Sequence, residues 1–248
     1  MAGKLYLIGI GPGSLDNITI RAMNKLKESD IIIGYSKYIE LIREIIGYKE
    51  IFGSSVVDEI ARAEMAIKYT IQGKKVSVIS SGDSGIYGMA GIVLEMVSHH
   101  NYDIDIEIVP GITSLSSSSS LIGTPLMNDF CSISLSDRLT PWEMIEKRIK
   151  SATESDFAIV FYNPKSQQRT EGIKKAREII MEYRNKNTPV GIIKNAYREN
   201  QESFVTNLEK FLDFDIDMFT TIIVGNSRSY QYKNYMITPR NYDLRYNL

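Results

Sequence analysis

Short apolar runs rich in β-branched residues alternate with longer stretches in which apolar residues recur every three or four positions. In the first half of the chain, the short runs predict strands at Leu5–Ile10, Ile31–Ile33, Val76–Ile79 and Ile104–Val109. The longer stretches predict helices at Thr19–Glu28, Tyr38–Ile46, Asp58–Gln72 and Tyr87–Ser98. Strands that alternate with helices in this way predict a mostly parallel sheet with helices on its faces.

The stretch 58–72 shows how these helices are expected to lie. Its apolar residues recur at helical spacing, so one face should pack on the sheet while the other meets water. The residues expected on the buried face are Ile60, Met65, Ile67 and Ile71, and those expected to face water are Arg62, Glu64 and Lys68.

The chain repeats the same alternation after Gly123-Thr124-Pro125. The strands expected there are Cys131–Leu135, Phe157–Tyr162, Val190–Lys194 and Thr220–Val224, and the helices are Pro141–Ser151 and Gln168–Tyr183. A tyrosine-rich tail, 230–248, should add one edge strand at Tyr235–Thr238. The sequence therefore predicts an α/β fold with two halves, an N-terminal domain over residues 1–125 and a C-terminal domain over residues 126–248.

Composition and charge exclude several classes of protein. Of the 248 residues, 43% are apolar and 24% charged, and 29 Lys and Arg nearly balance 30 Asp and Glu. Such a balance argues against a broad basic surface for nucleic acid. No apolar run reaches the roughly 18 residues that a membrane helix needs, and the N-terminus has no signal-peptide pattern. We expect a soluble cytoplasmic protein that binds neither nucleic acid nor a membrane.

Familiar catalytic and metal-binding arrangements are also missing from the sequence. The single cysteine, Cys131, excludes an internal disulfide framework and is expected to be a buried small residue. His99 and His100 are adjacent, so on a helix they diverge by about 100° and cannot form a metal-binding pair. We expect neither a metal site nor a Ser–His–Asp triad.

Five loops follow predicted strands and carry glycine, proline or small polar residues. The five loops are Gly9-Ile10-Gly11-Pro12-Gly13-Ser14, Ser80–Met89, Val109–Thr113, Tyr162–Pro164 and Asn195–Tyr197. The first is not a dinucleotide fingerprint, because its sixth position is Ser14 and Pro12 has no N–H for a pyrophosphate. Ligands of open α/β sheets bind beyond the carboxyl ends of the strands, so one shared cleft is expected.

Structural interpretations of the same residues remain open. The first loop can be a plain tight turn, and Asp83 can cap the helix that follows it. The serines of Ser114–Ser120 can belong to a helix whose hydroxyls bond back to the preceding turn. Beyond catalysis, a non-catalytic nucleotide-binding module would use the same glycine loops.

Three of these loops resemble the tetrapyrrole methylase family. Its shared signatures are LYLIGIGPGS, SGDSGIYG and VPGIT, and the resemblance runs from Leu5 to about Tyr242. The segments DFCSISLSDRLTPWE, FYNPKS, IIVGNS and TPRNY resemble the branch that methylates C17 of precorrin-3B and contracts the ring. That branch usually carries proline where this chain has Ser84, and mostly alanine at 116–120.

The resemblance implies a fold, a cofactor and a substrate. The fold is two αβα domains with the cofactor in a cleft between them, usually in a homodimer. The cofactor is S-adenosylmethionine, which leaves as S-adenosylhomocysteine. The substrate is a corrinoid tetrapyrrole, (cobalt-)precorrin-3, converted into (cobalt-)precorrin-4 in cobalamin biosynthesis. Alternatives within the family are another corrinoid carbon or a modified histidine of a translation factor.

The resemblance also implies site residues. Residues expected at the cofactor are Pro12, Ser81, Gly82, Asp83, Ile86, Thr113, Ser114, Asn163, Ala196, Gly225 and Asn226. Candidates for proton transfer during ring contraction are Asp83, Tyr87 and Asp129. Arg138, Lys165, Arg169 and Arg198 are expected to bind the substrate's carboxylates, because guanidinium groups match carboxylate geometry.

Overall fold

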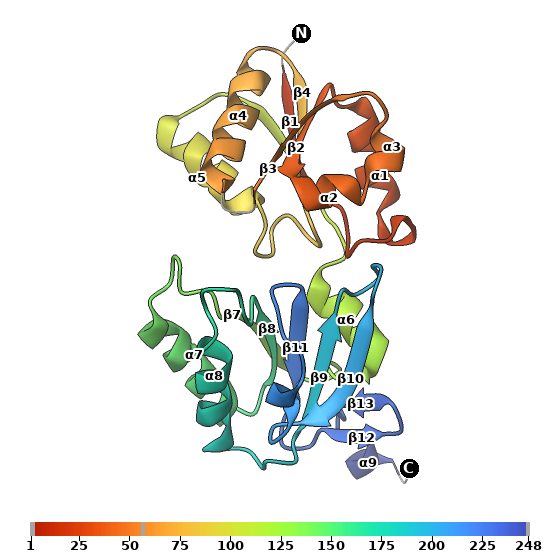
Figure 1. Ribbon diagram of the computed structural model, residues 1–248, viewed down its shortest axis with the longest axis vertical. Coiled ribbons are helices and arrows are strands. Elements are labelled where there is room, and N and C mark those ends of the chain that lie inside the picture. The colour runs from red at the N-terminus through yellow and green to blue at the C-terminus, as the bar shows by residue number, and fades with distance from the viewer. Residues whose placement is uncertain (1–2, 56–57, 247–248) are drawn as a thin grey trace. The chain divides into compact units, whose positions relative to one another are not determined.

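The computed structural model describes residues 3–55 and 58–246 and divides the chain into two compact units, 1–114 and 115–248. The division falls ahead of the expected boundary near residue 125. The cause is helix α6 (Ser114–Ile122), whose Leu115, Leu121 and Ile122 pack with Val160 and Ile223 of the second unit. Each unit has its own sheet and its own core (Figure 1).

The first unit contains a five-stranded parallel sheet in the order β3-β2-β4-β1-β5. Its strands are β1 (Lys4–Gly9), β2 (Ile31–Tyr35), β3 (Glu50–Ser54), β4 (Lys75–Ser80) and β5 (Asp105–Val109). Its helices are α1 (Ile20–Glu28), α2 (Ser36–Glu40), α3 (Arg43–Ile46), α4 (Glu59–Ile71) and α5 (Ala90–His100). The predicted parallel sheet of the first half is confirmed.

Strand β1 shows how the two faces of this sheet are covered. Leu5 and Leu7 pack with α4 and α5, whereas Tyr6 and Ile8 pack with α1, α2 and α3. Because side chains alternate along a strand, a strand covered on both faces reads as an unbroken apolar run. Figure 1 shows these two groups of helices on either side of the sheet.

The second unit contains a mixed five-stranded sheet in the order β10-β9-β11-β8-β7. Its strands are β7 (Phe130–Ser134), β8 (Ala158–Tyr162), β9 (Pro189–Lys194), β10 (Glu202–Asn207) and β11 (Thr220–Val224). Helices α7 (Trp142–Glu154) and α8 (Gly172–Met181) pack on one face and α6 on the other. A small sheet joins β12 (Tyr230–Tyr232), β13 (Tyr235–Ile237) and β6 (Gly123–Thr124), and α9 (Tyr242–Arg245) follows.

Strand direction in the second sheet decides which residues share an edge. β11 runs antiparallel to both β8 and β9, and β7 runs parallel to β8. The carboxyl ends of β7, β8 and β9 therefore lie at one edge of the sheet. β11 ends at the opposite edge, where Gly225 donates a hydrogen bond to the Pro189 carbonyl.

Several boundaries differ from the sequence predictions. The helix expected at 38–46 is two short helices, α2 and α3, with Leu41–Ile42 between them. Helix α5 begins at Ala90 rather than Tyr87, and α8 begins at Gly172 rather than Gln168. Strands β3 and β10 were not predicted. β13 is the middle strand of its sheet rather than an edge strand.

The faces of α4 also differ from the prediction. Ile60 and Ile71 are 60% and 57% exposed, while Arg62 is only 5% exposed. The Arg62 guanidinium donates hydrogen bonds to the Ser54 hydroxyl and the Ser55 carbonyl at the end of β3. These bonds explain why a charged side chain occupies the buried face.

No helix among residues 3–55 and 58–246 is long and apolar enough to span a bilayer.

Candidate active site

Three loops of the first unit meet at the carboxyl ends of β4, β1 and β5, which are neighbours in the sheet. Gly11 and Gly82 exchange two backbone hydrogen bonds, with N–O distances of 3.0 and 2.7 Å. Both residues have positive φ, +76° and +68°. A side chain is strained in that conformation, so glycine lets the first two loops pair directly.

The third loop packs against the first two through backbone atoms. A Cβ at position 111 would lie 2.1 Å from the Gly82 carbonyl oxygen, and a Cβ at position 9 would lie 2.6 Å from the same oxygen. Neither approach is possible for any residue with a side chain. The glycines of all three sequence motifs thus allow the loops to pack closely against one another. Three independent tight turns would not need such close backbone contacts.

Asp83 ties the second loop to the third. Its Oδ1 accepts a hydrogen bond from Gly85 N at 2.8 Å, and its Oδ2 accepts one from Gly111 N at 3.0 Å. The alternative that Asp83 caps a helix is wrong, because α5 begins at Ala90 with Met89 at its N-cap. The carboxylate instead holds the second and third loops together.

The side chains on and beside the three loops are of mixed polarity. Pro12 is buried, Ser81, Thr113 and Ser114 are half-buried, and Ile86 is 38% exposed. Tyr87 is 52% exposed and has a φ of +55°, a rare conformation for an aromatic residue. Small hydroxyls, backbone groups and exposed apolar carbons together match an amphipathic nucleoside.

Ser84 is fully buried, and its hydroxyl donates to the Leu7 carbonyl at 3.0 Å. The resemblance drawn from the sequence leads us to expect proline at this position. Because the Ser84 hydroxyl is bonded to a carbonyl of β1, replacing the expected proline by serine leaves no unpaired hydroxyl at the loops.

In the second unit, Asn163 and Ala196 follow β8 and β9 and share the carboxyl edge. The Asn163 amide donates to the Ser134 hydroxyl at 3.0 Å, which links the ends of β8 and β7. The Tyr197 and Ser120 hydroxyls are 2.9 Å apart, which ties the loop containing Ala196 to α6. Asn163, Asn195 and Tyr197 all have positive φ.

Sequence reasoning missed a lysine that supports this loop. Lys194, the last residue of β9, pairs with Asp215 and lies 3.0 Å from Asp217. The hydrogen bond that Lys194 donates to Asp215, followed by the one it donates to Asp217, raises the pKa of Lys194. In the sequence, only the Asp-x-Asp spacing at 215–217 indicates that a cation is bound there. The bonds hold the chain segment beneath Asn195, whose N–H donates to the Phe219 carbonyl.

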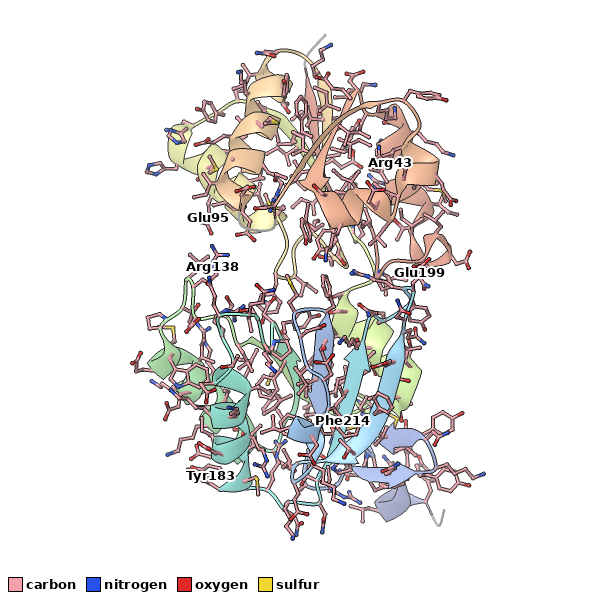
Figure 2. All side chains as sticks on the ribbon, viewed as in Figure 1. Arg43, Glu95, Arg138, Tyr183, Glu199 and Phe214 are labelled. Atoms are coloured by element: carbon pink, nitrogen blue, oxygen red, sulfur yellow. The ribbon has the colours of Figure 1, made fainter. Side chains whose placement is uncertain are left out.

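The four cationic residues assigned to the substrate also belong to the carboxyl edge. Arg138 follows β7, Lys165 and Arg169 follow β8, and Arg198 follows β9. Figure 2 shows Arg138 extending from its loop. Arg169 is more confined, since it donates to the Leu135 carbonyl at 3.2 Å and its Nε lies 3.9 Å from Asp137.

Three sequence-predicted site residues lie at the opposite edge. Asp129 precedes β7, and its carbonyl accepts from Ala158 N at the start of β8. Gly225 and Asn226 leave β11 at that same edge, where the Gly225 carbonyl accepts from Arg184 and Asn226 is buried in a turn. Asp129, Gly225 and Asn226 therefore do not share an edge with Asn163 and Ala196, and their roles in proton transfer and cofactor binding stay predictions.

The serine-rich helix is confirmed as α6. The Ser120 hydroxyl bonds back to the Ser117 carbonyl at 2.8 Å. The Ser118 hydroxyl is fully buried and has no hydrogen-bond partner among the described residues.

Ser118→Ala is therefore expected to raise the free energy of unfolding by about 1 kcal/mol, because a buried unpaired hydroxyl is costly. Ser116→Ala on the exposed face is the control, since it changes only helix propensity. Urea unfolding measures both. A loss of stability in Ser118→Ala alone would mean that this hydroxyl is bonded in solution.

Comparison with known proteins places these loops in a family. Residues 4–212 match the family described as Tetrapyrrole (Corrin/Porphyrin) Methylases. The chain belongs to the tetrapyrrole methylase family. The prediction from the loop motifs is thereby confirmed.

Curated tetrapyrrole methylases resemble the chain over nearly its whole length. It is 48% identical to the cobalt-factor III methyltransferase of Priestia megaterium, over 100% of this chain and 47% of that protein. It is 44% identical to the probable cobalt-factor III C(17)-methyltransferase of Salmonella typhimurium, over 97% of this chain and 100% of that one. The chain thus spans about half of the first protein and all of the second.

Solved structures of tetrapyrrole methylases have the same fold. The methyltransferase CobJ superposes with a TM-score of 0.88 at 32% identity, covering 96% of this chain and 100% of that one. Uroporphyrin-III C-methyl transferase from Thermus thermophilus, solved with S-adenyl homocysteine, gives 0.70 at 18% identity over 90% and 97%. The α/β architecture predicted from the sequence is confirmed.

Proposed function

We propose that the chain transfers a methyl group from S-adenosylmethionine to C17 of cobalt-factor III and contracts its ring, in cobalamin biosynthesis. The observation that carries the proposal is the full-length similarity to the Salmonella typhimurium protein, whose name gives methylation of cobalt-factor III at C17. Ring contraction is added by the family resemblance of the sequence. The Priestia megaterium relative also acts on cobalt-factor III by its name. These names favour the cobalt-containing substrate over metal-free precorrin-3B.

The loops of the first unit fit the cofactor. Gly9 and Gly111 let the three loops pack backbone against backbone, and Ile86 offers an exposed apolar surface. The residues that would hold S-adenosylmethionine here are Pro12, Ser81, Gly82, Asp83, Ile86, Thr113 and Ser114. Contacts from Asn163 and Ala196 of the second unit stay a prediction, as does the homodimer.

The cofactor, when bound, supplies an activated methyl group on a sulfonium, so the protein needs no nucleophile of its own. The chain's contribution is to hold donor and acceptor in line, which can supply roughly 7–11 kcal/mol. Both Asp83 oxygens already accept backbone hydrogen bonds. Tyr87, half exposed on the same loop, is the better candidate for moving a proton during ring contraction.

S-adenosylhomocysteine is expected to bind with one molecule per chain and to raise the melting temperature. A ligand that binds only the folded state stabilises it by mass action. Titration calorimetry and thermal unfolding measure the two effects. If neither this compound nor S-adenosylmethionine binds, the cofactor assignment fails, whatever the substrate.

Arg138→Ala and Arg169→Ala are expected to weaken corrinoid binding while leaving the dissociation constant of the cofactor unchanged. A charge-assisted bond to a carboxylate contributes roughly 1.5–3 kcal/mol, so each loss should lower affinity about tenfold or more. Titration with substrate at low and high salt tests this, because an exposed pair contributes at most about 1 kcal/mol and is screened. Unchanged affinity at both salt concentrations would make these arginines ordinary surface charges.

Incubation with methyl-labelled S-adenosylmethionine tests the class of function. Label in cobalt-factor III and not in metal-free precorrin-3B supports the proposal. Label in a different corrinoid would indicate a methylase for another carbon. Cofactor binding without label in any tetrapyrrole would indicate a non-catalytic nucleotide-binding module.

A further inference from the structure

Two branch-specific segments lie away from the loops assigned to methyl transfer. IIVGNS ends β11 and TPRNY leads into α9, at the opposite edge of the second sheet from Asn163 and Ala196. From Gly225 to Leu248 the sequence carries four cationic residues (Arg228, Lys233, Arg240 and Arg245) against one acidic residue, and five of the 15 tyrosines. The proposed methylation reaction does not account for this composition.

A buried polar network anchors the two segments to each other. Asn226 is 4% exposed, and its Oδ1 accepts hydrogen bonds from Arg228 N at 3.0 Å and Ser229 Oγ at 3.1 Å. The Ser229 hydroxyl lies 2.7 Å from that of Thr238, which is fully buried. The turn after β11 and the start of TPRNY therefore form one fixed unit.

This network places Arg228 beside the tail. Its guanidinium donates a hydrogen bond to the Asn241 side-chain oxygen. Asn241 itself has a φ of +61° and directs the chain into α9. The tail thus contacts the turn after β11 at Asn241.

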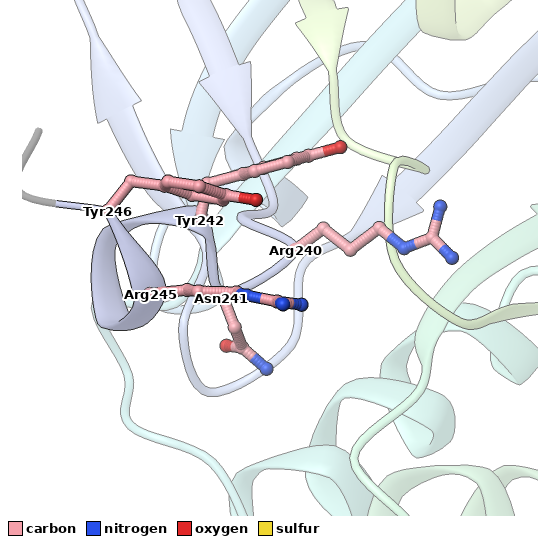
Figure 3. A pocket seen from close by; sticks show the side chains of 5 residues that line it. All are labelled: Arg240, Asn241, Tyr242, Arg245 and Tyr246. Carbon is pink, nitrogen blue, oxygen red and sulfur yellow. The ribbon is translucent and has the colours of Figure 1, made fainter.

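A pocket of about 160 Å³ opens at this point, lined by Arg240, Asn241, Tyr242, Arg245 and Tyr246. The Tyr242 and Tyr246 rings stack with centroids 6.2 Å apart, and the Arg245 guanidinium lies 5.9 Å from the Tyr246 ring centre. Figure 3 shows the two rings together with Arg245 below them, and Arg240 extending away from the rings. Two arginines and two aromatic rings thus line one pocket.

The described side chains supply no ion pair to the arginines of this pocket, Arg240 and Arg245. Guanidinium groups bind carboxylate and phosphate oxygens through paired hydrogen bonds, and an aromatic wall favours a flat ligand. We propose that this pocket, here named the tail site, binds a small oxyanion, a carboxylate or phosphate group, independently of methyl transfer.

The tail site is tested by calorimetric titration of the full chain with inorganic phosphate and, separately, with citrate. The two probes distinguish a phosphate site from a carboxylate site. The expected result is saturable binding of at least one probe at millimolar concentration. Arg240→Gln and Arg245→Gln should each weaken it about tenfold, and the double variant should abolish it.

Arg43→Gln is the matched control, because it removes one exposed arginine charge from α3 of the first unit. Binding by this variant should equal that of the unchanged protein. All four substituted proteins should bind S-adenosylhomocysteine equally, so failure of the tail site and failure of the methyltransferase proposal are distinguishable. Absence of binding in the unchanged protein, or equal binding in the double variant, would overturn the proposal.

Discussion

Gly111→Ala is expected to abolish cofactor binding and to lower the free energy of unfolding by roughly 3 kcal/mol or more, the upper range for overpacking. The added Cβ would lie 2.1 Å from the Gly82 carbonyl oxygen and 2.6 Å from two backbone atoms of Gly9. Those atoms belong to the two other loops of the site, so relief of the clash must separate loops that the cofactor is expected to bind together. Calorimetry and urea unfolding measure the two losses.

Gly91→Ala is the control for this substitution. A Cβ there meets nothing within 4 Å, and the residue lies inside α5. Alanine should therefore stabilise the protein by up to about 1 kcal/mol through helix propensity and leave cofactor affinity unchanged. If Gly111→Ala binds the cofactor as tightly as Gly91→Ala does, the three loops do not form its site.

Asp83→Ala is expected to lower both cofactor affinity and stability, because one carboxylate satisfies two backbone N–H groups in two loops. Removing their acceptor should cost about 1–3 kcal/mol of stability and weaken cofactor binding more than tenfold. Asp83→Asn should be intermediate, since one amide oxygen can still accept one of the two bonds.

Cofactor titration of the three proteins checks this order. Ser84→Ala is a useful comparison, because it removes a buried hydroxyl bond to Leu7 on the side of the loop facing β1. It should lower stability with little effect on affinity. Equal affinities in Asp83→Ala and the unchanged protein would limit this carboxylate to folding.

Burial explains which elements could be predicted from the sequence. β1 and β8 are covered on both faces, so they appear in the sequence as short apolar runs typical of buried strands. β10 is an edge strand, Glu202–Asn207, with no fully buried residue, and its only large apolar side chains are Phe204 and Val205. This hydrophobic pattern does not distinguish β10 from a loop.

The direction of β11 separates Gly225 and Asn226 from the other predicted site residues of the second unit. Both β10 and β11 run antiparallel to β9, so β11 ends at the edge where β9 begins. Gly225 and Asn226 then leave the sheet at the edge away from Asn163. Motif resemblance alone contains no information on strand direction.

Local motifs placed the loops of the first unit better than those of the second, because all strands of a parallel sheet end at the same edge. Three glycine-containing loops after three parallel strands must lie at one side, and the Gly11–Gly82 pairing joins two of them directly. Arg62 shows the limit of such reasoning. Its burial depends on acceptors at Ser54 and Ser55, which periodicity within α4 cannot indicate.

The position of the transferred methyl group tests the central claim most directly. Cobalt-factor III is incubated with S-adenosylmethionine carrying a ¹³C-labelled methyl group, and the product is examined by NMR. We expect one labelled methyl, attached to C17 of a contracted ring. A labelled methyl on another carbon, or an unlabelled tetrapyrrole under conditions in which the cofactor is bound, would contradict the account.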